Sequence, residues 1–262
     1  MKEIFCPGRT LPEAYHKAIL ALHREGDVLT CNDWNQNQKE ISMTFTVEEP
    51  LAEPRVSKLY IGGFKELQQY VMEIVDGLLD FRVGKGFEYT YHDRMARYPL
   101  ILRRDSPGAK DFNQLDFVVN ELRRNGDSRR AVVDIRDNNV DAFSSDCACL
   151  QHMQFLLRDG ALHCKVLMRS NDAVEAAFMN AFAFIMLQES LADALGAGMG
   201  TYTHRANSFH CYEKDYKLLE QYARGIEEKP LEELTYNYEG YFKELMEESI
   251  PGIMEAVGAL KK

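Results

Sequence analysis

The chain has 262 residues, which fits one large domain or two small ones and is long enough to bury a sizeable core. Its 31 basic and 41 acidic residues give a net charge of −10, which argues against non-specific binding to nucleic acid. The N-terminus lacks the apolar run of a signal peptide, so the six cysteines are expected to be reduced thiols in the cytoplasm, with no membrane attachment. Only one residue separates Cys147 from Cys149, and no second pair completes a zinc site, so we expect no metal.

The N-terminal half predicts helices and one strand in alternation. A helix should start at Thr10, where Pro12 and Glu13 complete a capping pattern. Residues 32–38 read as a polar loop, and residues 40–48 alternate as a strand does. Further helices are expected after the Gly62-Gly63 break and from about Asp111, because apolar side chains recur there at helical spacing.

The C-terminal half predicts a hairpin followed by a central helix. Residues 131–135 read as a buried strand, and residues 149–157 and 162–168 as a hairpin around a turn at 158–160. Residues 173–195 form an almost wholly apolar helix, and residues 201–212 a further strand. With no linker or repeat, the pattern predicts one domain over residues 1–262, of class α+β, with a mixed β-sheet flanked by helices.

Several polar residues stand out against this framework. Cys149 is either a buried core thiol or a nucleophile, and a nucleophile needs nearby arginines to favour the thiolate. Asn180 lies in the middle of the apolar helix, where an unpaired amide costs about 1–3 kcal/mol, so it bonds either to a neighbouring backbone group or to a ligand.

Two further groups of side chains are open to both a structural and a functional interpretation. Ser208, His210 and Tyr212 alternate and therefore share one face of their strand, which is either an edge facing solvent or a ligand-binding face. Arg129 and Arg130 suit either a solvated turn or bidentate phosphate binding.

Taken in order, these residues resemble the thymidylate synthase superfamily. The matching motifs are Asp127-Ser128-Arg129-Arg130, Cys149, Gln154-Phe155, Arg169-Ser170-Asn171-Asp172, Asn180 and His210-x-Tyr212, in register over about 85 residues. Arg-Ser-Asn-Asp and Cys-Leu-Gln look most like the archaeal-type synthases and the pyrimidine nucleotide hydroxymethylases. Upstream, the segment around Glu66 resembles the helix with the family's catalytic glutamate, and Tyr91 with Pro99 resembles its Tyr…Trp-Pro segment.

The resemblance implies a role for each residue. Cys149 would add to carbon 6 of a pyrimidine, with Glu66, Tyr91 and Arg169 as the other catalytic residues. The substrate, a pyrimidine nucleoside monophosphate, would be held by Ser170, Asn180, His210 and Tyr212, and by Arg129 and Arg130 of the partner subunit in a homodimer. Asp172 would face the cofactor, 5,10-methylenetetrahydrofolate or a methanopterin analogue.

Three functions remain open on these residues. The first is methyl transfer from dUMP to dTMP, the second 5-hydroxymethylation of dUMP, dCMP or CMP, and the third nucleotide binding without catalysis. Asn180 favours uracil, because the cytosine hydroxymethylases resembled here place Asp at that position. The cofactor side departs from the family, since Trp34 is the only tryptophan and Phe81 is the candidate to replace the family's stacking tryptophans.

Overall fold

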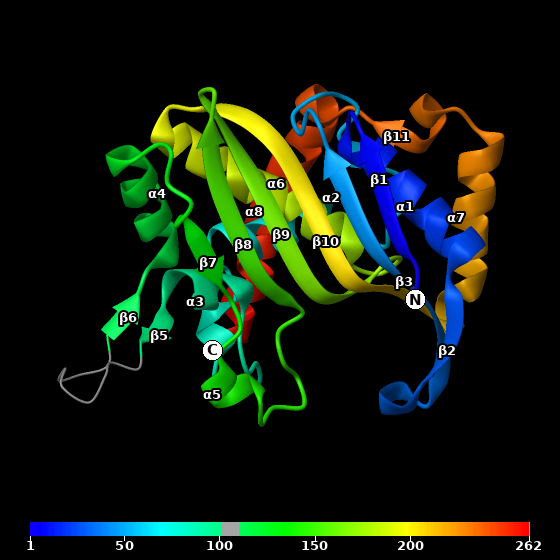
Figure 1. Cartoon of the computed structure of the whole chain (residues 1–262), viewed down its shortest axis with the longest axis horizontal. Coiled ribbons are helices and arrows are strands. Elements are labelled where there is room, and N and C mark those ends of the chain that lie inside the picture. The colour runs from blue at the N-terminus through cyan, green and yellow to red at the C-terminus, as the bar shows by residue number, and fades with distance from the viewer. Residues whose placement is uncertain (101–109, 262) are drawn as a thin grey trace.

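The computed structural model describes residues 1–100 and 110–261, and a seven-stranded sheet runs through it (Figure 1). Its strands are β1 (Glu3–Gly8), β2 (Asp27–Cys31), β3 (Gln36–Val47), β7 (Val132–Asp134), β8 (Leu150–Arg158), β9 (Ala161–Asp172) and β10 (Gly198–Tyr212). The strand order is β1-β3-β10-β9-β8-β7, and β2 pairs with β3. Because β1–β3 and β9–β10 are parallel pairs and the others antiparallel, the predicted mixed sheet is confirmed.

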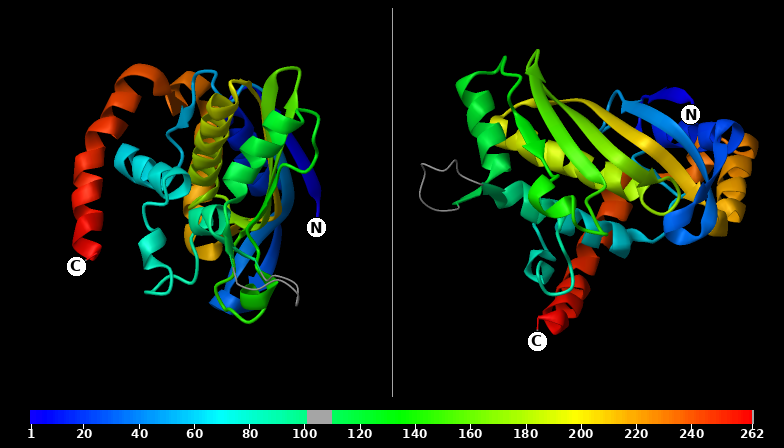
Figure 2. Two further views of the ribbon diagram at one scale, coloured as in Figure 1. Left: turned by 90° about the vertical axis from the view of Figure 1, so that its left-hand side faces the viewer. Right: turned by 60° about the horizontal axis from the view of Figure 1, so that its bottom comes forward.

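Eight α-helices are present in the described ranges: α1 (Leu11–Glu25), α2 (Phe64–Val75), α3 (Tyr91–Ala96), α4 (Gln114–Arg124), α5 (Asn138–Asp141), α6 (Ala177–Leu195), α7 (Tyr216–Glu228) and α8 (Lys243–Leu260). The long ones lie on one side of the sheet (Figure 2). Two short ribbons complete the structure: β4 (Val56–Ser57) with β11 (Thr235–Tyr236), and β5 (Tyr98–Leu100) with β6 (Lys110–Phe112). None of the described helices is both long and apolar enough to cross a membrane.

The core lies between the sheet and α6, as the apolar patterns predict. Ile41, Met43, Phe45 and Val47 of β3 are all 0 % exposed, so the expected alternation is confirmed. Helix α6 is buried along most of its length, because apolar side chains surround it on nearly every side. On the opposite face of the sheet, alternating side chains such as Thr44, Lys165 and Thr203 remain at least partly exposed.

Local signals explain where several elements begin. Thr10 caps α1 by accepting a hydrogen bond from the backbone N–H of Glu13, as predicted. Asp159 and Gly160 have φ values of 50° and 76°, the left-handed pair that a two-residue hairpin turn requires between β8 and β9.

Three predicted boundaries are wrong. The segment 32–38 is shorter than a full loop, because β3 already begins at Gln36 and pairs with the unpredicted β2. The helix expected from about Asp111 begins at Gln114, where Asn113 provides the cap. The central helix begins at Ala177 rather than residue 173, because Asp172 holds the intervening backbone in a turn.

Candidate active site

The polar residues lie where the core-facing side chains of β9 and β10 change from apolar to polar. Along β9 the core face is apolar from Leu162 to Met168 and then presents Ser170 and Asp172. In the parallel pairing, Ser170 lies beside Ser208 of β10, and Asp172 beside His210. These positions fall at the carboxyl ends of both strands, and Ser170, Asp172 and Ser208 are partly exposed there, so the polar groups form a rim at this end of the sheet.

Cys149 lies at this rim, beside β9. Its Sγ is 3.3 Å from the Ser170 Oγ, and its carbonyl accepts a hydrogen bond of 2.8 Å from the Arg169 N–H. The Arg169 guanidinium donates to the carbonyls of Ala148 and Cys147 at 3.0 and 2.7 Å. Arg169 therefore holds the chain that presents the thiol, and the expected pairing of the two strands is confirmed.

Three tyrosines lie near the thiol. Tyr91 Oη accepts a hydrogen bond of 3.3 Å from the backbone N–H of Leu150, the residue after Cys149. Burial raises the pKa values of Tyr70, Tyr89 and Tyr91, with a smaller contribution from the nearby Cys149 in each case, so the phenols stay protonated. Tyr89 and Tyr91 also line a cavity of about 390 Å³.

Asn180 is 5 % exposed and reaches this cluster through Tyr70. The Tyr70 hydroxyl donates a hydrogen bond to Asn180 Oδ1. The amide that looked unpaired in the sequence thus has one partner on a neighbouring helix. Among the described residues this is the side-chain hydrogen bond of the amide, so both Nδ2 protons and the second lone pair of Oδ1 remain for a ligand.

His210 and Tyr212 stand on the same face of β10, as predicted. Their rings pack edge to face with centroids 4.8 Å apart, and the Ser208 Oγ lies 3.3 Å from His210 Nδ1. Trp34 packs edge-on against Tyr212 at 6.4 Å although it is 65 % exposed. Trp34 lies in the turn between β2 and β3, and it reaches Tyr212 because β3 pairs with β10, with Gln38 opposite Tyr212.

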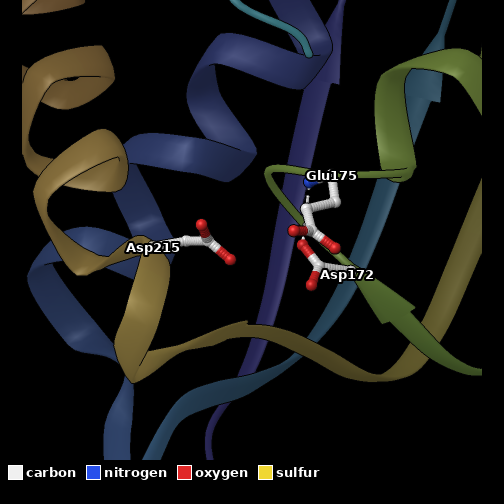
Figure 3. A group of neighbouring side chains, drawn as sticks. All are labelled: Asp172, Glu175 and Asp215. Atoms are coloured by element: carbon white, nitrogen blue, oxygen red, sulfur yellow. Dashed lines mark hydrogen bonds between the residues drawn. The ribbon is translucent and has the colours of Figure 1, made fainter.

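Asp172 closes the rim together with two other carboxylates (Figure 3). Its Oδ1 accepts hydrogen bonds of 2.9 Å from the N–H groups of Val174 and Glu175, whereas its Oδ2 is buried without a partner among the described residues. Burial raises the pKa of Asp172, although these N–H groups oppose that shift. Glu175 and Asp215 face it, and the Lys214 ammonium lies 2.6 Å from Glu175, which offsets part of the negative charge.

Glu66 does not join this cluster. It is exposed in the first turn of α2, where its Oε2 accepts a hydrogen bond of 2.9 Å from the Gly63 N–H. Glu73, two turns further along α2, lines the 390 Å³ cavity with Tyr70, Tyr89 and Tyr91. Burial raises the pKa of Glu73, and Gln69 donates a hydrogen bond of 2.8 Å to it. Glu73, rather than Glu66, is therefore the carboxylate of α2 that lines this cavity.

Arg129 and Arg130 lie away from Cys149 within one chain. The Arg129 carbonyl accepts a hydrogen bond from Gln154, which is five residues, or about 16 Å of strand, along β8 from Cys149. Arg130 donates to Glu121 at 2.8 Å, and hydrogen bonds from Ser128, Arg124 and Arg130 lower the pKa of Glu121 to about 2. Neither arginine reaches its own chain's thiol, so a role at the site requires a second subunit.

Comparison with known proteins gives the family. Residues 63–249 match the family model described as "Thymidylate synthase". A protein of Methanocaldococcus jannaschii named "Putative thymidylate synthase" is 31 % identical over 222 residues, which cover 81 % of this chain and 93 % of that protein. A protein of the same name from Methanosarcina barkeri is 27 % identical over 218 residues, or 83 % and 94 % of the two chains.

A solved structure supports the same conclusion for the fold. Thermostable thymidylate synthase A from Bacillus subtilis superposes with a TM-score of 0.63 at 17 % identity, over 82 % of this chain and 84 % of that one. The chain belongs to the thymidylate synthase family. The resemblance recognised in the sequence, including its likeness to archaeal members, is confirmed.

Proposed function

We propose that this protein is a methyltransferase of nucleotide biosynthesis that converts dUMP to dTMP through a covalent adduct on Cys149. The observation that carries the proposal is the setting of the thiol. Its Sγ contacts Ser170, and its neighbour Leu150 contacts Tyr91. Asn180, which can read a pyrimidine edge, joins the same cluster through Tyr70.

Each side chain has a task that its geometry supports. The Cys149 thiolate adds to carbon 6 of the pyrimidine, and the electron pair of the 5,6 double bond moves onto carbon 5 and the carbonyl oxygen at carbon 4. Asn180 donates to that oxygen and stabilises its developing charge. Arg169 and Ser170 bind phosphate, His210 and Tyr212 bind the ribose hydroxyl, and Glu73 or Tyr91 moves the proton lost from carbon 5.

Asp172 fits the one-carbon carrier that the family implies. Its buried Oδ2 lacks a donor among the described residues, and the ring N–H groups of a folate or methanopterin are donors of the required kind. The bound carrier supplies the one-carbon unit and, for a methyl product, the hydride. Asp172 would orient it, while Trp34 covers the neighbouring Tyr212.

The open face of the sheet supports a homodimer. Gln154 and its cross-strand neighbour Lys165 lie on that face, and Gln154 also binds the carbonyl of Arg129. A second copy packed there would carry its Arg129 and Arg130 toward this chain's phosphate site. Phosphate binding by these arginines across the interface is part of the proposal.

The adduct can be tested directly with 5-fluoro-dUMP. We expect a covalent complex in the presence of methylenetetrahydrofolate, with the mass shift on Cys149 and not on Cys147, because only Cys149 contacts Ser170. Cys147→Ser is the matched control and should keep the adduct. An adduct that survives Cys149→Ser and disappears in Cys147→Ser would contradict the assignment.

Product masses then separate the three functions. Incubation with methylenetetrahydrofolate and each of dUMP, UMP, dCMP and CMP should yield a methylated product from dUMP. A hydroxymethyl product would establish the second function. Binding without any product would establish the third.

The shared site predicts complementation between inactive subunits. Mixing Cys149→Ala with Arg129→Ala subunits should restore about a quarter of wild-type activity, since half the dimers are hybrids with one intact site. Mixing Cys149→Ala with Arg169→Ala should restore none, because Arg169 serves the thiol of its own chain. Equal results from both mixtures, or a monomer in light scattering at micromolar concentration, would exclude the shared site.

A further inference from the structure

Tyr70 of α2 and Asn180 of α6 form a buried contact between two helices. The Tyr70 hydroxyl donates to Asn180 Oδ1, and among the described residues it is the side-chain partner of that amide. In the sequence, Tyr70 falls at the helical spacing of the apolar side chains that follow the Gly62-Gly63 break. Its hydroxyl nevertheless points at the residue expected to read the base.

The proton on Tyr70 fixes the direction of this hydrogen bond. Burial raises the pKa of Tyr70, and the nearby Glu73 carboxylate raises it further, so the hydroxyl keeps its proton near neutral pH. A phenol has one proton to donate, and the only acceptor on a carboxamide is its oxygen. The contact therefore favours the amide orientation with Oδ1 toward Tyr70.

On the basis of the proposed function, we propose that Tyr70 is a positioning residue. By holding the Asn180 amide in one orientation, it sets the preference for uracil over cytosine. In the locked orientation, Nδ2 donates to the carbonyl at carbon 4 of uracil, and the second lone pair of Oδ1 accepts from the ring N3–H. Cytosine has an amine at carbon 4 and no proton on N3. Its binding requires the amide to flip, and the flip leaves the Tyr70 proton without its acceptor.

The test measures dissociation constants for dUMP and dCMP by calorimetry, without any carrier present. We expect Tyr70→Phe to reduce the ratio of the dCMP dissociation constant to the dUMP dissociation constant by about tenfold, because the amide can then flip at little cost. Tyr202→Phe is the matched control. It removes another buried hydroxyl, one that bonds to His204 at 2.8 Å, and should leave the ratio unchanged.

A double-mutant cycle shows whether Tyr70 acts through Asn180. In an Asn180→Ala background, adding Tyr70→Phe should not further change the ratio of the dCMP dissociation constant to the dUMP dissociation constant. As a second variant, Asn180→Asp can accept from Tyr70 through either oxygen, so the preference should move toward dCMP by about tenfold or more even with Tyr70 intact.

The outcomes distinguish this inference from the proposed function. If the wild-type protein prefers dUMP and Tyr70→Phe keeps the same ratio, the role of Tyr70 is overturned and the proposed function is not. A reduced ratio in Tyr202→Phe equal to that in Tyr70→Phe also overturns it, since a general loosening would then explain both. A wild-type protein that binds neither nucleotide overturns the proposed function and this inference together.

Discussion

Two carboxylates on one helix show how position decides chemistry at the scale of single residues. Glu66 and Glu73 are seven residues apart on α2, so they share one helix face but lie about 10.5 Å apart along its axis. Glu66 caps the helix start in solvent, whereas Glu73 reaches the cavity beside Tyr70. A general acid or base must lie within hydrogen-bond reach of the substrate, which favours Glu73.

Exchanging each carboxylate for an amide should separate the two roles. We expect Glu73→Gln to lower kcat with dUMP about 100-fold or more, because general acid–base groups contribute in that range. Glu66→Gln, as the matched control, should change kcat little, because it alters only the hydrogen bond with which Glu66 caps α2. Dissociation constants for dUMP should be nearly unchanged in both. A large loss of kcat in Glu66→Gln with an active Glu73→Gln would restore the original assignment.

The sequence predicts the residues of the candidate site better than it predicts their partners. Cys149, Arg169, Ser170 and Asn180 occur in motifs whose spacing is visible in the chain. The structure brings the first three into contact and bonds Asn180 to Tyr70. Tyr70 and Trp34 could not be found this way, since contacts between helices or between neighbouring strands leave no fixed spacing.

At the scale of elements, the connection after α2 carries two of the site's tyrosines. The helix ends at Val75, and Gly77 just beyond it has a φ of 68°, which permits the Leu78 N–H to bond back to the Met72 carbonyl. Asp80 then binds His92 at 2.7 Å and also Thr90, the cap of α3. These contacts orient the segment that presents Tyr89 and Tyr91 to the thiol.

Gly77 should therefore be sensitive to any added side chain. A Cβ at this position would lie 2.2 Å from His92 Nδ1 and 2.6 Å from an Asp80 carboxylate oxygen. We expect Gly77→Ala to lower both the unfolding midpoint and the rate of 5-fluoro-dUMP adduct formation. Gly84→Ala shares the positive φ, at 73°, but meets no atom within 4 Å, so it should cost only about 1 kcal/mol of backbone strain. Equal adduct rates in the two variants would contradict this account.

Elements with strong local chemistry were predictable, and elements with polar faces were not. The β8–β9 hairpin follows from its Asp159-Gly160 turn, and β3 from its alternating apolar residues. Strand β2 is exposed at four of its five positions, and the start of β3 is polar, so neither shows the alternation of a half-buried strand. Pairing between the two strands, rather than burial, holds them in place.

At the scale of the whole molecule, buried histidines link stability to pH. His16 is 4 % exposed and lies 2.8 Å from the Ser57 Oγ, and burial lowers its pKa from 6.5 to about 4. Burial lowers the pKa of His204 to about 3. The folded state keeps both rings neutral while the unfolded state takes up protons below pH 6.5, so stability is lost as the pH falls from 6.5 toward 4.

Replacing His16 should flatten this dependence. The pKa shift of His16 corresponds to about 3 kcal/mol of unfolding free energy when it acts in full. Urea unfolding at pH 7.5, 6.5, 5.5 and 4.5 should therefore show the wild type losing stability faster than His16→Gln. His152→Gln, a variant of a partly exposed histidine paired with Asp134, should follow the wild-type slope. Parallel slopes for the wild type and His16→Gln would exclude His16 as a source of acid sensitivity.

The place of β10 in the sheet has a consequence for synthesis on the ribosome. Among the described strands, β1, β2 and β3 join the rest of the sheet through β10, which pairs with β3 on one side and β9 on the other. The first 47 residues of the chain must wait for residues 198–212 to emerge before they can dock. Such long-range pairing makes folding slow and leaves the edge of β3 open to other chains meanwhile. Chaperones that shield nascent strands should therefore raise the yield of this protein more than added stability does.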